Sequence, residues 1–140
     1  MAGITMIDDY AHHPTEVEAM VQVARAGGYG RVVAVFQPHL YTRTERLYHE
    51  FGQALSAADR VVVTDVYAAR EAPIPGVSGE MIANAVAKLE GGVFYAPHRA
   101  DLASLVAELV EPGDLVLTMG AGDITLLPTE LAALLEASEE

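Results

Sequence analysis

Five short, almost wholly apolar runs alternate along this chain with longer stretches whose apolar residues recur every three to four positions. The runs are nearly continuous in apolar residues, which is typical of strands covered on both faces, and the stretches between them have the spacing of amphipathic helices. This alternation predicts a three-layer αβα, Rossmann-like, doubly wound fold with a mostly parallel sheet of five or six strands. The strands are expected at 4–7, 32–36, 61–66, 93–96 and 115–119.

Residues typical of helix starts follow several of these runs. Pro14 suits the first turn of a helix, and Thr42 with Glu45 has the spacing of a capping box. Asp101 and Asp123 are each placed to cap a helix. Four of the five predicted strands are therefore followed by a residue typical of a helix start.

Composition limits the size of the protein and the kind of partner. With 140 residues, 51% of them apolar, the chain can bury one core, and we expect a single domain over 1–136 with a frayed acidic tail at 137–140. The eight Lys and Arg against twenty Asp and Glu give a net charge of −12, which argues against nucleic-acid or membrane-surface partners. The chain contains no Cys, so thiol chemistry is excluded. No apolar run approaches the ~18 residues that span a bilayer, and a cytoplasmic location is expected.

In this fold class, ligands bind beyond the carboxyl ends of the strands. Polar and aromatic residues gather at these positions in the chain. Residues 8–14 contain two carboxylates, a tyrosine, two histidines and a proline, more than a plain connection needs. An alternative is that Asp9 caps the next helix and the histidines are simply solvated. Because His12 and His13 are adjacent, we expect at most one of them to face a shared cleft.

The residues after the second predicted strand include His39 and Arg43. A guanidinium at the mouth of a cleft suits bidentate capture of a carboxylate or phosphate. The alternative is an exposed ion pair of Arg43 with Glu45 or Glu50, which would contribute little. The position at a strand end favours ligand binding.

Three other features have weaker functional interpretations. Gly120 to Asp123 could receive an anion on backbone N–H groups, but the segment lacks dinucleotide-binding spacing, and close packing explains its glycines better. No zinc site is expected, because no histidine pair has ligand spacing. The acidic pair Asp8-Asp9 with Asp65 resembles a phosphoacceptor receiver domain, which needs a lysine after its last strand. The only lysine, Lys88, lies in a predicted helix, so the receiver stays a second interpretation.

Four motifs together carry a family resemblance. The motifs are Asp-Asp-Tyr-Ala-His-His-Pro-Thr-Glu at 8–16, Phe-Gln-Pro-His with Tyr-Thr-Arg-Thr at 36–44, Glu-Ala-Pro-Ile-Pro-Gly at 71–76 and Gly-Ala-Gly-Asp at 120–123. In this order they resemble the C-terminal domain of the Mur ligases, and the resemblance extends over essentially all 140 residues.

The resemblance, which favours the alanine-adding members of the family, implies a ligase of peptidoglycan precursor synthesis. Such an enzyme uses ATP and Mg²⁺ to phosphorylate the carboxylate of UDP-N-acetylmuramate, and the amine of L-alanine then attacks the acyl phosphate. Mur ligases have three domains, and this chain resembles the third. The phosphate-binding loop, the magnesium ligands and the sugar-nucleotide domain are then expected upstream, and this domain alone is expected to be inactive.

Matched residue by residue, the resemblance implies roles at the strand ends. Asp9 is expected to contact ATP at its ribose. Tyr10, His12, His39 and Arg43 are expected to form the alanine pocket, with Arg43 on the carboxylate and the histidines orienting the amine. The chemistry agrees, because an amino acid needs a cation for its carboxylate and neutral acceptors near its nitrogen. The identity of a catalytic base stays open.

One position departs from the family motif. Leu40 stands where the family often has an arginine. Either Arg43 alone carries more of the carboxylate binding, or a neighbouring group compensates, or position 40 is peripheral. If the family's arginine at this position shares the substrate carboxylate, this chain keeps only Arg43 of that pair.

Overall fold

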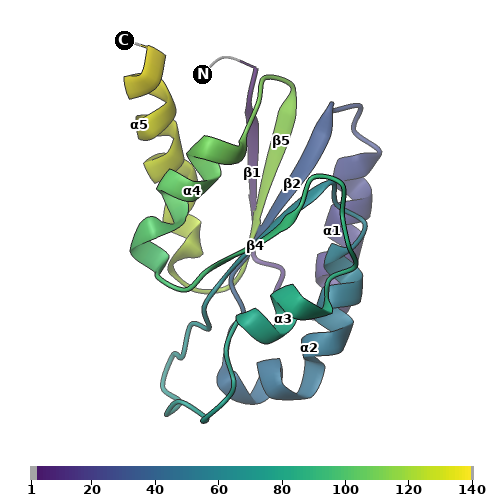
Figure 1. The fold of residues 1–140 in the computed structure, drawn as a ribbon, viewed down its shortest axis with the longest axis vertical. Coiled ribbons are helices and arrows are strands. Elements are labelled where there is room, and N and C mark those ends of the chain that lie inside the picture. Colours follow the sequence, from purple (N-terminus) through teal and green to yellow (C-terminus); the bar gives the residue numbers. More distant parts are fainter. Residues whose placement is uncertain (1–2, 140) are drawn as a thin grey trace.

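The sheet consists of five parallel strands, seen in a computed structural model that describes residues 3–139 (Figure 1). The strand order is β1-β5-β2-β3-β4, and no sixth strand occurs within 3–139. This confirms the predicted α/β fold, and each predicted strand is found within two residues of its expected limits. The strands are β1 (Thr5–Asp9), β2 (Arg31–Phe36), β3 (Arg60–Thr64), β4 (Val93–Ala96) and β5 (Asp114–Met119).

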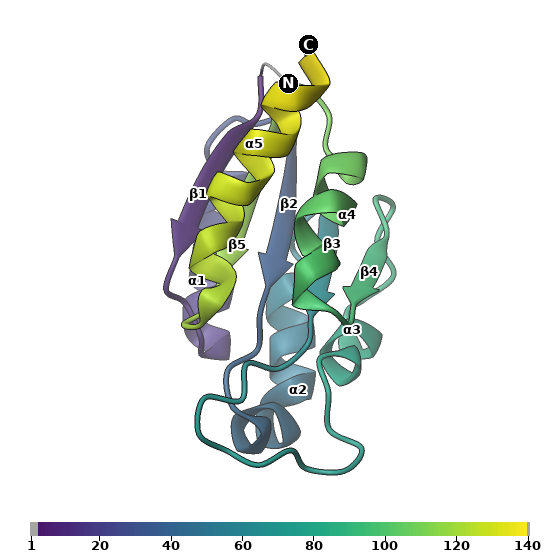
Figure 2. The ribbon, with the colours of Figure 1, turned by 90° about the vertical axis from the view of Figure 1, so that its left-hand side faces the viewer.

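Helices cover both faces of the sheet (Figures 1 and 2). From β1 to β4 the chain moves across the sheet in one direction, so right-handed crossovers place three helices on one face. The chain then returns to insert β5 beside β1, which places the last two helices on the other face. The first group is α1 (Pro14–Arg25), α2 (Tyr41–Leu55) and α3 (Glu80–Ala85), and the second is α4 (Leu102–Leu109) and α5 (Leu127–Glu139).

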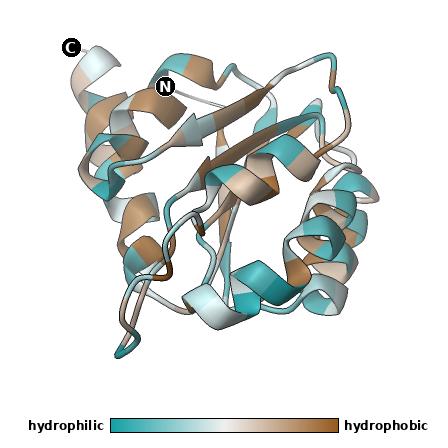
Figure 3. Cartoon of the chain, turned by 60° about the horizontal axis from the view of Figure 1, so that its bottom comes forward, coloured by the Kyte–Doolittle hydropathy of each residue, from teal (hydrophilic) through white to brown (hydrophobic). Residues whose placement is uncertain are grey.

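The core has two halves, one on each face of the sheet. Alternate residues of β2 point to opposite faces, so Val32, Ala34 and Phe36 pack beneath α1 and α2 while Val33 and Val35 pack beneath α4 and α5. All five side chains are at most 2% exposed. The apolar strands and the mixed colouring of the surrounding helices are visible in Figure 3. Burial on both faces explains why the strands are continuous in apolar residues.

Two adjacent strands open the crevice that positions the candidate site. β2 and β5 lie side by side, but β2 leads into α2 and β5 leads, through the short 3₁₀ helix η2 (Asp123–Leu126), into α5 on the opposite face. A crevice forms at the carboxyl ends of strands whose following helices diverge in this way. Asp9 of β1 and Phe36 of β2 are both in register with Met119 of β5. The turns after β1, β2 and β5 therefore meet at one place.

The start of α1 differs in part from the prediction. Pro14 is the first helical residue, as expected, but Asp9 does not cap the helix. His13 occupies the N-cap position, and the carboxylate of Glu16 accepts hydrogen bonds from the backbone N–H groups of His12 and His13 at 3.2 and 3.1 Å. These two bonds hold the pKa of Glu16 below its usual value, although slight burial opposes them.

Of the other predicted helix caps, only Asp101 occupies the expected position. α2 begins at Tyr41, so Thr42 lies inside the first turn and forms no capping box with Glu45. Asp101 occupies the N-cap position of α4 without a side-chain capping bond. Asp123 opens η2, but its carboxylate binds the side chain of Gln37. At the starts of α2 and η2, side chains from elsewhere in the chain accept hydrogen bonds from backbone N–H groups instead: Glu71 binds Thr42, and Gln37 binds Ile124.

The end of the chain is helical as far as it is described. α5 continues through Glu139, so helix extends beyond the limit of the domain predicted over 1–136. Glu140, together with Met1 and Ala2, lies outside the described residues. The boundary at 136 stays a prediction. None of the helices within 3–139 has both the length and the apolar composition needed to cross a membrane.

Candidate functional site

His39 lies beyond the carboxyl end of β2, between the rings of Tyr67 and His12. Its ring stacks on Tyr67, with centroids 5.6 Å apart, and faces the ring of His12 at 6.3 Å. Backbone hydrogen bonds hold this arrangement: the N–H of Tyr67 donates to the carbonyl of Pro38 at 2.8 Å, and the N–H of Leu40 donates to the carbonyl of Tyr67 at 3.0 Å. The segments after β2 and β3 are thereby joined beyond the ends of the strands, as an isolated parallel bridge.

The turn after β1 brings one of its two histidines to His39. His12 faces His39, whereas His13 is exposed at the start of α1, in agreement with the expectation that at most one would face the crevice. Nδ1 of His12 lies 2.9 Å from the carbonyl of Tyr10, which can only accept a hydrogen bond. A proton on Nδ1 leaves Nε2 of the neutral ring as an acceptor. The ring of Tyr10 meets His12 edge to face at 5.0 Å and is 67% exposed.

Asp9 ends β1 beside this turn. Its Oδ1 accepts a hydrogen bond from the backbone N–H of Ala11 at 2.9 Å, and its carbonyl accepts one from Gly120 at 3.2 Å. Within the described chain, Oδ2 of Asp9 makes no hydrogen bond. The carboxylate is thus held at the edge of the crevice with one oxygen available.

Arg43 carries an unpaired donor into the site. Its side chain is partly buried, and its Nη1 is buried without a hydrogen-bond partner. Its guanidinium makes no ion pair with any carboxylate of residues 3–139, so the predicted alternative of a pair with Glu45 or Glu50 is not found. Buried donors are almost always satisfied in proteins, and an unsatisfied one at a strand end favours a ligand. Nδ1 of His39 is also buried and unpaired.

The pKa of His39 responds to its surroundings. Burial lowers the pKa of His39 below its ordinary 6.5, and the charges of Arg43 and His12 lower it further, with partial opposition from Glu71. Because these charges act on His39, its imidazole is favoured in the neutral form near pH 7. The site therefore combines one cation with a neutral ring that can accept a proton.

Sequence reasoning missed the role of Glu71. Its carboxylate accepts hydrogen bonds from the backbone N–H of Thr42 at 3.2 Å and from the Thr42 hydroxyl at 2.5 Å, and so caps α2 from 29 positions away in the chain. The hydroxyl contact is the main reason that the pKa of Glu71 is lowered. Glu71 opens one of the four family motifs, and that was the only signal in the sequence.

The glycine-rich turn after β5 serves close packing, as predicted. A Cβ on Gly122 would lie 2.5 Å from Cγ of Tyr67, and a Cβ on Gly120 would lie 3.0 Å from the carbonyl of Gln37. Gln37 is buried, and its amide donates to Asp123 at 2.7 Å. The turn therefore supports the ring that stacks on His39.

The residues that suggested a receiver domain are not assembled into one site. Asp8 accepts a hydrogen bond from Thr118 at 2.6 Å, and Asp65 accepts one from the backbone of Gly79 at 2.9 Å. β1 is an edge strand here, whereas a receiver places its first strand inside the sheet. Among the described residues, no group of three His, Asp or Glu is arranged to hold a metal ion.

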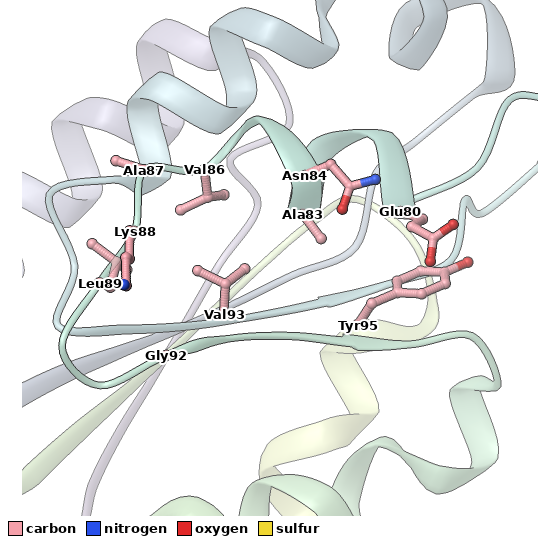
Figure 4. Close-up of a pocket in the computed structure, with 10 residues that line it drawn as sticks. All are labelled: Glu80, Ala83, Asn84, Val86, Ala87, Lys88, Leu89, Gly92, Val93 and Tyr95. Carbon is pink, nitrogen blue, oxygen red and sulfur yellow. The ribbon is translucent and has the colours of Figure 1, made fainter.

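A separate hollow of about 530 Å³ lies between α3 and β4 (Figure 4). Its lining includes Glu80, Lys88 and Tyr95 and none of the predicted site residues. Burial and the charge of Asp65 raise the pKa of Tyr95 to about 12. The tyrosine therefore stays protonated, and the hollow adds no titrating group to the site near neutral pH.

Comparison with known proteins places the chain in a family. Residues 1–122 match the family described as "Mur ligase, glutamate ligase domain". The chain is 53% identical to the UDP-N-acetylmuramate--L-alanine ligase of Cutibacterium acnes and 56% identical to that of Saccharopolyspora erythraea, over 97% and 96% of its length. It spans only 29% and 28% of those two relatives.

Solved structures agree with the sequence matches. The UDP-N-acetylmuramate-alanine ligase of Thermotoga maritima superposes with a TM-score of 0.76 at 29% identity, over 96% of this chain and 27% of that one. The MurF ligase of the same organism, in complex with ADP, shares the fold with a TM-score of 0.68 at 19% identity, over 98% of this chain and 30% of that one. The receiver interpretation gains no support from these matches. The chain belongs to the Mur ligase family, as its C-terminal domain.

Proposed function

We propose that this domain binds L-alanine and contacts ATP in an enzyme that ligates L-alanine to UDP-N-acetylmuramate through an acyl phosphate. The names of relatives more than 50% identical support the reaction. The observation that carries the proposal is the buried, unpaired Nη1 of Arg43, which lies in the first turn of the helix that follows His39. The whole reaction belongs to a longer protein, of which this chain is one domain.

The chemistry of an amino acid fits the three basic side chains. Arg43 supplies the donor for the carboxylate, and no carboxylate of the described chain competes for it. The amine of L-alanine must lose a proton before it attacks, so it needs neutral acceptors around it. His39, whose pKa is lowered mainly by burial, provides an acceptor of that kind, and Nε2 of His12 offers a second one when the proton of its ring is on Nδ1. Tyr10 lines the exposed side of the pocket.

ATP contact is assigned to Asp9. One oxygen of its carboxylate is engaged with Ala11, and the other is available for the ribose hydroxyls. The proposal assigns the magnesium and phosphate ligands to the remainder of the enzyme, as the family resemblance implies. ATP and nucleotide-linked sugars are made in the cytoplasm, and the proposal includes that location.

The test joins this chain to the missing part of a ligase. The matching C-terminal region of the Cutibacterium acnes relative is replaced by residues 1–140, and ADP release is measured with ATP, UDP-N-acetylmuramate and each amino acid. We expect release that depends on L-alanine, and none from the 140-residue chain alone. The unaltered relative serves as the control. ADP release that depends on a different amino acid would contradict the proposal.

A further inference from the structure

The first turn of α2 has no cap of its own. Leu40 occupies the N-cap position and offers no side-chain acceptor, so the first N–H groups of the helix would lack partners. Glu71 supplies the acceptor: its two oxygens receive the backbone N–H and the hydroxyl of Thr42. A backbone hydrogen bond from Tyr41 also contributes to lowering the pKa of Glu71.

The same connection holds the residue before α2 in an unusual conformation. Leu40 has φ 73, a region that non-glycine residues rarely adopt, and its N–H is bound by the carbonyl of Tyr67. Tyr67 and Glu71 both belong to the long connection between β3 and α3, which passes beside the start of α2 (Figure 2). The same connection therefore supplies Tyr67, which stacks on His39, and Glu71, which caps the helix that carries Arg43.

Arg43 lies one residue beyond the Thr42 contact. Glu71 is close enough for the charge of Arg43 to lower its pKa, yet the two side chains form no ion pair. The guanidinium thus stays free for an incoming carboxylate while its helix turn is held in place. Because Glu71 binds Thr42 rather than the guanidinium, it holds the helix turn in place and leaves Arg43 free.

We propose that Glu71 is a positioning residue: by capping the first turn of α2 through Thr42, it holds the Arg43 guanidinium where the carboxylate of the amino-acid substrate binds. This inference rests on the proposed function for the identity of that substrate. It also gives the Glu71–Gly76 motif a role that does not require contact with any ligand.

The first arm of the test uses the joined ligase. We expect Glu71→Ala to raise the KM for L-alanine about tenfold or more, with kcat and the KM for ATP changed less than about threefold. Glu71→Gln should recover most of the loss, since its amide can satisfy both Thr42 groups. Thr42→Val should raise the alanine KM by less. Glu50→Ala, which removes an exposed carboxylate from the same helix, serves as the matched control.

The second arm needs no catalysis. The pKa of His39 is measured by NMR in the 140-residue chain; Arg43 of α2, His12 of the first turn and Glu71 of the β3–α3 connection are the charged groups that act on it. Both Glu71 variants lose the charge that raises the pKa of His39. The charge of Arg43 lowers the pKa of His39. Only Glu71→Ala also lets Arg43 move away, and the loss of that charge raises the pKa of His39. We therefore expect His39 to titrate at a higher pH in Glu71→Ala than in Glu71→Gln.

Different outcomes would overturn the inference and the proposed function. An unchanged alanine KM in Glu71→Ala, or equal His39 pKa values in the two Glu71 variants, would overturn the positioning role. A parallel rise in the alanine and ATP KM values would overturn it too, because that result indicates general loosening. A wild-type joined ligase that ignores L-alanine, with the His39 difference intact, would overturn the proposed substrate and leave the placement of Arg43 supported.

Discussion

Arg43 is the residue whose removal tests the alanine pocket most directly. We expect Arg43→Ala in the joined ligase to cost about 1.5 to 3 kcal/mol of transition-state binding, or roughly 10- to 200-fold in kcat/KM for L-alanine. The substitution removes the buried Nη1 donor of Arg43, which has no partner within the described chain and which we assign to the carboxylate of L-alanine. Arg46→Ala removes an exposed cation from the same helix and is the control. Unchanged kinetics with L-alanine would contradict the assignment of Arg43 to the alanine pocket.

Asp9 allows the ATP assignment to be separated from the alanine assignment. Asp9→Ala is expected to raise the KM for ATP more than the KM for L-alanine. Asp9→Asn keeps an oxygen for the backbone N–H of Ala11 and so tests the carboxylate with the turn intact. Steady-state kinetics with each substrate varied in turn provide the measurement. A larger rise in the KM for L-alanine than in the KM for ATP would instead assign Asp9 to the alanine pocket.

His39 links the site to the pH dependence of stability. Its pKa in the folded protein is lowered, first by burial and then by Arg43 and His12, from 6.5. The unfolded chain therefore binds the proton first as the pH falls, so the contribution of His39 to stability is complete above about pH 6.5 and declines below it. Urea unfolding between about pH 7.5 and 5.5 should show this decline. His39→Gln should flatten it, and His49→Gln, at an exposed position of α2, should not.

At the scale of elements, the turn after β5 and the connection after β3 stabilise each other. A Cβ on Gly122 would meet Cγ of Tyr67 at 2.5 Å and Oε1 of Gln37 at 2.6 Å. We expect Gly122→Ala to destabilise the fold by about 1–3 kcal/mol, because neither neighbour can move without disturbing the crevice. It should also displace the Tyr67 ring from His39, which NMR would detect. Thermal or urea unfolding gives the stability change.

The matched control for that substitution is Gly28→Asn. Gly28 has φ +81 with no atom near its Cβ position, and asparagine tolerates such a conformation. We expect a change below about 0.5 kcal/mol. Equal stability losses at Gly28 and Gly122 would contradict the expectation that contact with Tyr67 and Gln37 decides the result.

The starts of α1 and α2 show how far element boundaries follow from local sequence. Pro14 marks the start of α1, because its fixed φ suits a first turn wherever the rest of the chain lies. Thr42 and Glu45 predict a start for α2 that the structure does not adopt, since Glu71 supplies the cap. A side chain 29 positions away has no local signature in the sequence.

At the scale of the whole molecule, both halves of the core share the same five strands. Because neither half can form without the sheet, the 140-residue chain should unfold in one cooperative transition. Calorimetry should give equal calorimetric and van't Hoff enthalpies. Two resolved transitions would contradict this expectation. The folded chain should still release no ADP, because one domain supplies only part of the proposed site.

The sequence by itself determined the class of fold, the position of each strand within two residues and the turns in which the candidate residues lie. These follow from periodicity, burial and the rule that ligands bind at the carboxyl ends of parallel strands. Tertiary structure alone decided the strand order, the placement of His12 beside His39, the freedom of Arg43 from carboxylates and the cap from Glu71. The physical reason is distance along the chain: local periodicity specifies which face of a strand or helix is buried, whereas these contacts join turns that meet only after the sheet has formed.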